Sequence, residues 1–193
     1  MSLLKYLLIP LFIIVISTTS ASFAKKAAIV IDFDTKEVLF EVNANTRNYP
    51  ASLTKIMTLY ILFDMLEKKQ ITNQTKLKVS SIAASRSPSK LYLEEGSTIK
   101  VEDAVMALII KSANDVATVV AENISGTEKK FAKLMTSYAK DLGMNNTTFK
   151  NASGLPNRAQ LTTARDISIL SHALISNFPE KYKLFNTQKF TYK

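Results

Sequence analysis

The sequence of 193 residues contains no cysteine and only one histidine, His172. Without cysteine the chain can form neither disulfides nor metal sites built from thiolates. A single histidine excludes a multi-histidine metal cluster and argues against a Ser-His-Asp triad. Its place within an expected helix favours a structural role. We therefore expect a function that requires no metal and no cofactor.

Glycine is also scarce, and it occurs at four positions: Gly96, Gly126, Gly143 and Gly154. None of them has a lysine two residues before it, so the sequence contains no Lys-Thr-Gly motif. No compact basic run with interleaved aromatic side chains is present, which leaves nucleic acid binding without support. The net charge of +9 is compatible with solubility or with an anionic polymer as a partner.

The first 24 residues have the three-part layout of a secretory signal peptide. Lys5 supplies a positive charge, residues 6–16 form an apolar run, and residues 17–24 end in a small-x-small pattern that predicts cleavage after Ala24. The run is shorter than the ~20 residues of a membrane-spanning helix, and an uncleaved N-terminal anchor is the alternative. Either interpretation places the bulk of the chain outside the cytoplasm, in the periplasm or extracytoplasmic envelope. Removal of residues 1–24 leaves 169 residues with net charge +8, which suits one domain.

The segment 49–58 is the one around which the rest of the chain is organised. Residues 53–66 read as a mostly apolar helix, and a Pro-Ala turn places Ser52 at its first turn with Lys55 three residues on. Residues at i and i+3 share a helix face, and the positive helix end favours an alkoxide over a hydroxyl. A buried lysine loses proton affinity and can act as a base. The pair therefore indicates a serine nucleophile activated by a lysine.

The pattern Ser-x-x-Lys is weak evidence by itself, because it occurs six times, beginning at Ser2, Ser22, Ser52, Ser87, Ser97 and Ser137. Only Ser52 opens a long apolar helix directly after a turn. The alternative role of Ser52 is an ordinary helix N-cap, for which serine is a preferred residue.

The remaining pattern predicts an α/β protein of the α+β type. Residues 27–33 and 38–42 read as strands of an antiparallel hairpin. Further helices are expected over residues 53–68, 101–109, 116–123, 127–142 and from 162 or 163 to a stop before Pro179, and a strand over 188–193. A polar junction, 111–115, separates two apolar helices and contains Ser112 and Asn114, the only Ser-x-Asn in the chain. Such a junction can bring side chains into a cleft, although capping and turn formation is the plain alternative.

Several of these segments, in this order, resemble the D-alanyl-D-alanine carboxypeptidases, the low-molecular-mass penicillin-binding proteins of the serine-lysine peptidase type. They are Pro-Ala-Ser-Leu-Thr-Lys (50–55), Leu-Tyr-Leu (91–93), Lys-Ser-Ala-Asn-Asp (111–115), the loop 151–155 and the helix start 163–166. The resemblance runs from about residue 26 to residue 193. It implies a β-lactamase/transpeptidase-like fold in which an antiparallel sheet, incomplete in this chain, packs with a helical cluster.

The resemblance also implies roles for four residues. Ser52 would be the nucleophile that forms the acyl-enzyme, and Lys55 the base that takes its proton. Ser112 would relay a proton toward the leaving D-alanine, and Asn114 would bind the substrate's amide or carbonyl. The implied substrates are peptidoglycan stem peptides ending in D-Ala-D-Ala, with β-lactams as covalent inhibitors. Peripheral association with the membrane is a further expectation.

The family's Lys-Thr-Gly strand follows the point where this sequence ends. It would supply a cation for the substrate's terminal carboxylate and a second N–H for the oxyanion beside that of Ser52. We therefore interpret residues 25–193 as the front part of a carboxypeptidase domain, shortened by a broken gene, a split gene or a partial record. Two expectations follow: the isolated chain has little carboxypeptidase activity, and the hairpin 27–42 exposes an apolar face or sheet edge.

Three functional hypotheses remain open at this point. The first is a D-Ala-D-Ala carboxypeptidase that acts through an acyl-enzyme on Ser52. The second is a non-catalytic remnant or binding module that holds cell-wall peptides without turning them over. The third is a relative of class A β-lactamases, which carry Ser-Asp-Asn where this chain has Ser-Ala-Asn at 112–114.

Overall fold

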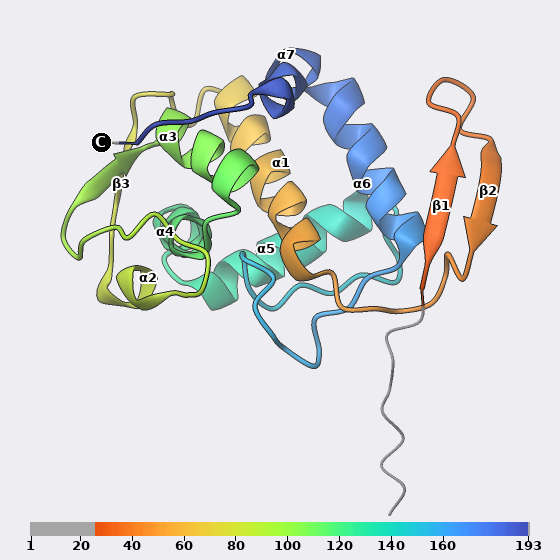
Figure 1. Ribbon diagram of the computed structural model, residues 1–193, viewed down its shortest axis with the longest axis horizontal. Helices are drawn as coiled ribbons and strands as arrows, with labels where there is room; N and C mark the ends of the chain where they lie inside the picture. The colour runs from red at the N-terminus through yellow and green to blue at the C-terminus, as the bar shows by residue number, and fades with distance from the viewer. Residues whose placement is uncertain (1–25, 193) are drawn as a thin grey trace, which may run out of the picture.

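A computed structural model describes residues 26–192 (Figure 1). The expected signal peptide, residues 1–24, lies outside the described residues. Within the part of the chain that is described, no helix is both long enough and apolar enough to span a membrane.

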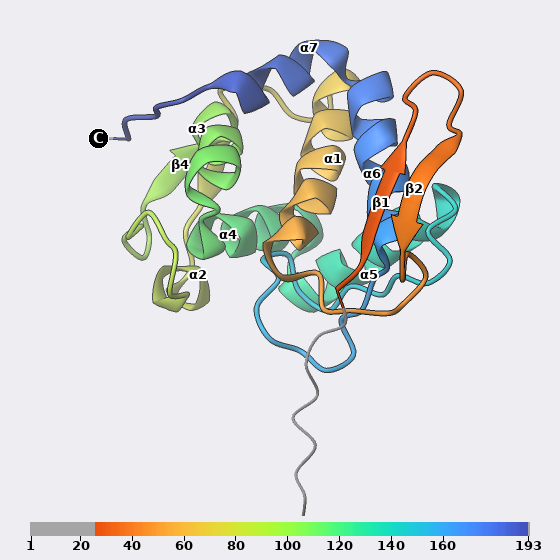
Figure 2. The same cartoon turned by 45° about the vertical axis from the view of Figure 1, so that its right-hand side comes forward.

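The described chain is a helical cluster flanked by two small antiparallel sheets (Figures 1 and 2). The strands are β1 (Ala28–Ile31), β2 (Val38–Val42), β3 (Lys76–Lys78) and β4 (Thr98–Lys100). The α-helices are α1 (Thr54–Glu67), α2 (Ser81–Ser85), α3 (Val101–Met106), α4 (Asn114–Ser125), α5 (Glu128–Asp141), α6 (Ala164–Asn177) and α7 (Pro179–Tyr182). Three tight or wide helical turns complete it: the 3₁₀ turn η1 (Ala51–Leu53), the π-helical turn η2 (Ala107–Lys111) and the 3₁₀ turn η3 (Lys183–Asn186).

Helix α1 lies at the centre, which explains why its sequence is apolar on nearly every face. Met57, Ile61 and Phe63 are completely buried, and α1 contacts α4, α5 and α6. Full burial of one such side chain contributes about 1.5–3 kcal/mol to stability. The helix expected over 53–68 is thus confirmed, and its burial holds the turn that carries Ser52 against the rest of the core.

The capping residues expected from the sequence begin two of the outer helices. The Thr127 hydroxyl accepts the Lys130 amide at the start of α5, and the Thr163 hydroxyl accepts the Asp166 amide at the start of α6. Each bond satisfies an amide that has no partner within the first turn of a helix. Of the two residues expected to open the fourth helix, Thr163 is therefore the cap.

The hairpin β1–β2 packs beside α6 at one end of the molecule (Figure 2). The ring of His172, on α6, packs against the ring of Phe33, and His172 Nε2 forms a hydrogen bond with the backbone carbonyl of Phe33. These contacts agree with the structural role expected for the single histidine. The opposite face of the hairpin is apolar and open: Val30 and Phe40, which are paired across the strands, are 50% and 55% exposed. The expected exposed apolar face is confirmed.

The prediction of a strand over residues 188–193 is wrong, because residues 187–192 have no regular secondary structure. After α7 and η3 the chain runs back toward α3 (Figure 1), where Phe190 and Tyr192 pack against the core. The alternating pattern reflects this half-buried tail. No strand among residues 26–192 pairs with it through backbone hydrogen bonds.

Candidate active site

The turn before α1 presents Ser52 at the surface. Ala51 adopts a left-handed backbone conformation, with φ of 46°, and begins the 3₁₀ turn that leads into α1. The Leu53 amide donates to the Pro50 carbonyl at 3.1 Å and closes the turn. Ser52 is exposed in this turn. The expected placement of Ser52 at the start of the apolar helix is confirmed, and its side chain forms no N-cap hydrogen bond.

Lys55 lies one turn further on and is buried, with 3% of its surface exposed. Its Nζ donates to Oδ1 of Asn114 at 2.9 Å and to the backbone carbonyl of Ser153 at 2.6 Å. Burial lowers the pKa of Lys55 from 10.5 to about 8, since removal from water disfavours the charged form. A lysine with this pKa is partly neutral near physiological pH and can accept a proton.

The junction between α3 and α4 places the Ser-x-Asn motif beside α1. Helix α3 widens at its C-terminal end into the π-helical turn η2. Ser112 ends this turn in a left-handed conformation with φ of 53°. π-helical turns are often found at functional sites. Asn114 then begins α4, its backbone N–H donating to the Ser89 carbonyl and its Nδ2 to the Ser87 carbonyl. These bonds orient the Asn114 side chain so that Oδ1 faces Lys55.

Ser52, Lys55 and Ser112 line one cavity of about 520 Å³. Ile109 and Phe185, from the π-helical turn and the C-terminal 3₁₀ turn, form part of its wall. The three polar side chains predicted from the sequence are therefore brought together, with Asn114 bonded to Lys55 from α4. Among residues 26–192 no hydrogen bond joins the hydroxyls of Ser52 and Ser112 to Lys55. Contacts of this kind often tighten only in a complex with substrate.

The loop 151–155 supplies contacts that the sequence did not reveal. The Ala152 carbonyl accepts a hydrogen bond from Thr58 at 2.8 Å, while the neighbouring Ser153 carbonyl accepts one from Lys55. Gly154 lies against the Ser52 turn, since a Cβ atom there would stand 1.8 Å from the Ala51 carbonyl oxygen. The only signal for this proximity was the resemblance of the loop to the carboxypeptidases. Backbone carbonyls have no side-chain identity that a sequence pattern could show.

Asp115, the residue after Asn114, fixes a second segment near the site. Its buried carboxylate accepts hydrogen bonds from the backbone N–H groups of Leu91 and Leu93, and of Val116 on its own helix. Negative charge in the first turn of α4 is also favoured by the helix dipole. The segment 91–93 is thereby tied to the motif 111–115, which explains why both belong to one resemblance.

The sequence model of the D-alanyl-D-alanine carboxypeptidases, peptidase family S11, matches residues 14–193. This chain belongs to that family. The match covers the Ser52 turn, the 111–115 junction and the loop 151–155 in one alignment. Within residues 26–192 of this carboxypeptidase family member, no three His, Asp or Glu side chains gather in a way that could hold a metal ion.

Individual relatives support the same assignment. The chain is 38% identical over 158 residues to the D-alanyl-D-alanine carboxypeptidase DacF of Bacillus subtilis, covering 82% of this chain and 41% of the relative. The crystal structure of DacD from Francisella tularensis matches with a TM-score of 0.81 at 40% identity, over 83% of this chain and 39% of that one. Penicillin-binding protein D2 of Listeria monocytogenes in its ampicillin-bound form matches with a TM-score of 0.72 at 34% identity, over 80% and 63%.

These neighbours show the transpeptidase/β-lactamase-like fold that the resemblance implied. The D-alanyl-D-alanine carboxypeptidase family member described here spans about two fifths of the length of the DacF and DacD chains it matches. The described residues contain the helical cluster and the two small sheets, β1–β2 and β3–β4.

Proposed function

We propose that this chain carries the acylation machinery of a serine D-Ala-D-Ala carboxypeptidase. Ser52 is the nucleophile, Lys55 the base, Ser112 the proton relay and Asn114 the group that binds the substrate's amide or carbonyl. One observation carries the proposal: the buried amine of Lys55 is bonded to Asn114 and lines the same cavity as Ser52 and Ser112.

The two acceptors around Lys55 suit a base. A neutral amine has two N–H donors and one lone pair. Asn114 and the Ser153 carbonyl accept both donors, so the lone pair is left for a proton from the Ser52 hydroxyl. Neither acceptor is charged, and neither adds a negative charge that would hold the proton on the lysine.

The reaction follows from these positions. Ser52 Oγ attacks the carbonyl carbon of the penultimate D-alanine while its proton passes to Lys55, and a tetrahedral oxyanion forms. Collapse of this intermediate breaks the amide bond, and the proton returns through Ser112 to the amine of the leaving D-alanine. Water then attacks the ester on Ser52 and releases the shortened peptide. Covalent catalysis thus divides a difficult amide cleavage into two easier steps.

The family supports the choice of substrate and inhibitor. The relatives' names state that they act on D-alanyl-D-alanine, and a neighbour is a penicillin-binding protein in an ampicillin-bound form. Stem peptides ending in D-Ala-D-Ala are accordingly the proposed substrates, and β-lactams the proposed covalent inhibitors. Residues 1–24 are proposed as a signal peptide that delivers residues 25–193 to the periplasm or extracytoplasmic envelope. There we propose that the chain associates peripherally with the membrane.

Covalent labelling by a fluorescent penicillin tests the proposal. Because the 193 residues contain no Lys-Thr-Gly motif, acylation is a more direct measurement than turnover. We expect one label per chain, on Ser52 by peptide mass spectrometry, lost in Ser52→Ala. Ser137→Ala, which changes another Ser-x-x-Lys serine on α5, is the matched control and keeps the label.

Two other results would contradict the proposal. An unlabelled but folded chain that still binds stem peptides would favour the non-catalytic binding module. Rapid hydrolysis of the penicillin, with no accumulation of the acyl-enzyme, would favour a β-lactamase. The carboxypeptidase reaction itself is measured as release of D-alanine from a D-Ala-D-Ala peptide. We expect the isolated chain to release D-alanine slowly.

A further inference from the structure

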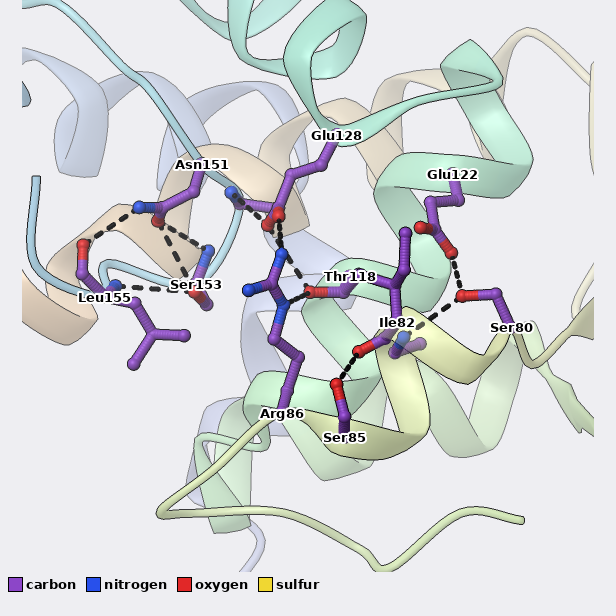
Figure 3. Close-up of polar contacts among 12 residues, drawn as sticks. Ser80, Ile82, Ser85, Arg86, Thr118, Glu122, Glu128, Asn151, Ser153 and Leu155 are labelled. Carbon is purple, nitrogen blue, oxygen red and sulfur yellow. Dashed lines mark hydrogen bonds and ion pairs between the residues drawn. The ribbon is translucent and has the colours of Figure 1, made fainter. Parts of the chain in front are cut away.

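An ion pair outside the cavity connects three parts of the fold. Nη2 of Arg86, at the end of α2, lies 2.5 Å from Oε2 of Glu128, the first residue of α5, and the Glu128 side chain is only 13% exposed (Figure 3). Between them, the hydroxyl of Thr118 on α4 accepts a hydrogen bond from Nε of Arg86 and lies 3.4 Å from Oε1 of Glu128. Neither Arg86 nor Glu128 lines the cavity that contains Ser52.

One branch leads from this pair to the first acceptor of Lys55. Oε1 of Glu128 accepts the backbone N–H of Ala152 at 3.2 Å. The Ser153 carbonyl, two peptide units further along the chain, accepts the hydrogen bond from Lys55 at 2.6 Å. Ala152 and Ser153 are buried. The Glu128 carboxylate therefore holds the buried segment that leads to the Ser153 carbonyl, together with Thr58, which donates to the Ala152 carbonyl in between.

A second branch leads to the other acceptor. The residue after Arg86 is Ser87, whose carbonyl accepts a hydrogen bond from Nδ2 of Asn114 at 3.1 Å. Oδ1 of the same amide accepts the bond from Lys55. Thr118, which is bonded to Arg86, lies four residues after Asn114 on α4, and residues at this spacing lie on one face of a helix. Together with the ion pair, the two branches form a closed path of hydrogen bonds and backbone segments. The path starts at the Lys55 amine and returns to it.

We infer that Arg86 and Glu128 are positioning residues that hold both acceptors of the Lys55 amine in place. Neither touches the reacting atoms. Each acts through a backbone segment: Glu128 through 152–153, and Arg86 through Ser87 and Asn114. The catalytic consequence rests on the proposed function, but the arrangement itself does not.

A gain in stability does not by itself explain why an ion pair occupies this position. Replacing a partly buried ion pair by apolar residues is often neutral or favourable, because removing charges from water is costly. A guanidinium and a carboxylate do, however, offer several bonding directions at once. Here Glu128 bonds Arg86 and the Ala152 N–H at the same time, which an apolar pair cannot do. The ion pair therefore contributes by keeping α2, α5 and the loop 151–155 in a fixed arrangement.

Acetylation of Lys55 measures this geometry without any need for enzyme activity. The full chain is treated briefly with a small amine-reactive acetylating reagent at pH 8, and each lysine peptide is quantified by mass spectrometry. In the native chain we expect Lys55, which is 3% exposed, to react slowly. The exposed Lys133 of α5 provides an internal reference for reagent activity.

Four variants separate positioning from general stability. Glu128→Ala removes the carboxylate bonds to Arg86 and to the Ala152 N–H, whereas Glu128→Gln keeps a carbonyl acceptor for the Ala152 N–H. Arg86→Gln is a milder change that leaves the Glu128 bond to Ala152 in place. Glu122→Ala is the matched control, because Glu122 is a partly buried glutamate that accepts a hydrogen bond from Ser80, the N-cap of α2, but does not reach the loop (Figure 3).

We expect the acetylation rate of Lys55 to rise about tenfold in Glu128→Ala, the size expected for loss of a hydrogen bond to a charged group. A smaller rise is expected in Arg86→Gln. Glu128→Gln should restore a rate within about threefold of the native one, by retaining that acceptor. Glu122→Ala should leave the rate unchanged. Native-like Lys55 rates in both Glu128→Ala and Arg86→Gln would overturn the inference, as would an equal rise in Glu122→Ala.

Penicillin labelling of the same variants tests the catalytic consequence. In Glu128→Ala we expect the maximal rate of Ser52 acylation to fall about tenfold while the half-saturating penicillin concentration stays the same. A chain in which native Ser52 is never acylated would contradict the proposed function. The acetylation rates would still decide whether Arg86 and Glu128 hold the acceptors of Lys55.

Discussion

Nζ of Lys55 lies 2.9 Å from Oδ1 of Asn114, although 59 residues separate them in the sequence. The partner is a neutral amide in a site where a carboxylate would make a stronger bond to an ammonium group. A carboxylate would also hold the proton on the lysine. The amide orients the amine while allowing burial to keep the pKa of Lys55 near 8, and this choice leads to the first two predictions.

Acylation of Ser52 should depend on pH through Lys55. The base must be neutral, and the neutral fraction rises as the pH passes through the pKa of about 8. We expect the rate of penicillin labelling to increase about tenfold from pH 7 to pH 9, with a midpoint near 8. Lys55→Arg should abolish labelling over the whole range, because a guanidinium keeps its proton. A flat rate between pH 6 and 10 would exclude Lys55 as the base.

Asn114→Asp should raise the pKa of Lys55. The new carboxylate keeps an oxygen beside Nζ but adds an opposite charge, which favours the ammonium form by about 1–3 pKa units. The midpoint of the pH–rate curve should move above 9, and the labelling rate at pH 7 should fall by at least about tenfold. Asn114→Ala, which removes the oxygen without adding a charge, provides the comparison and should not raise the midpoint.

Gly154 and Gly143 form a matched pair for testing the contact between the loop and the Ser52 turn. Both have φ of 88°, so alanine at either position is strained by about 1–2 kcal/mol. A Cβ atom at Gly154 would also clash with the Ala51 carbonyl, whereas at Gly143 it would meet no atom within 4 Å. We expect Gly154→Ala to reduce the free energy of unfolding by about 1–3 kcal/mol more than Gly143→Ala in urea denaturation. Equal losses would show that the loop and the turn are not in contact.

The sequence predicted the site more completely than the sheet. Ser52 and Lys55 could be found because their chemistry depends on side-chain identity and on a short spacing along a helix, whereas the role of Asn114 was implied by the resemblance to the carboxypeptidases. The helix of α1 and the caps Thr127 and Thr163 follow from local rules of the same kind. The structure confirms helix α1 and both caps, and the catalytic roles of Ser52, Lys55 and Asn114 stay predictions.

What could not be predicted depends on contacts distant in the sequence. The Ser153 carbonyl is a backbone group, and its role arises from the packing of the loop against α1. The bond from Glu128 to Ala152 links two ordinary-looking segments that no local pattern joins. The tail 188–192 alternates like a strand, but a strand also needs a neighbour with which to pair, and the described residues provide none there.

The open face of the hairpin leads to the last prediction. Val30 and Phe40 lie opposite each other on β1 and β2 and are half exposed. Apolar side chains gathered on a sheet face favour association with other molecules. We expect the sedimentation coefficient of the chain to increase with concentration, and Phe40→Lys to reduce this dependence.

The control for this change is Ile82→Lys on α2, because Ile82 is 54% exposed and Phe40 55%. Both variants add one charge and remove one exposed apolar side chain, so a general gain in solubility would affect them equally. Substitutions at exposed positions usually alter stability by less than about 0.5 kcal/mol, and both thermal transitions should therefore stay close to the native one. Only Phe40→Lys should weaken association if the hairpin is the surface responsible. A native chain that remains monomeric at every concentration would show that this apolar face does not bind a second copy.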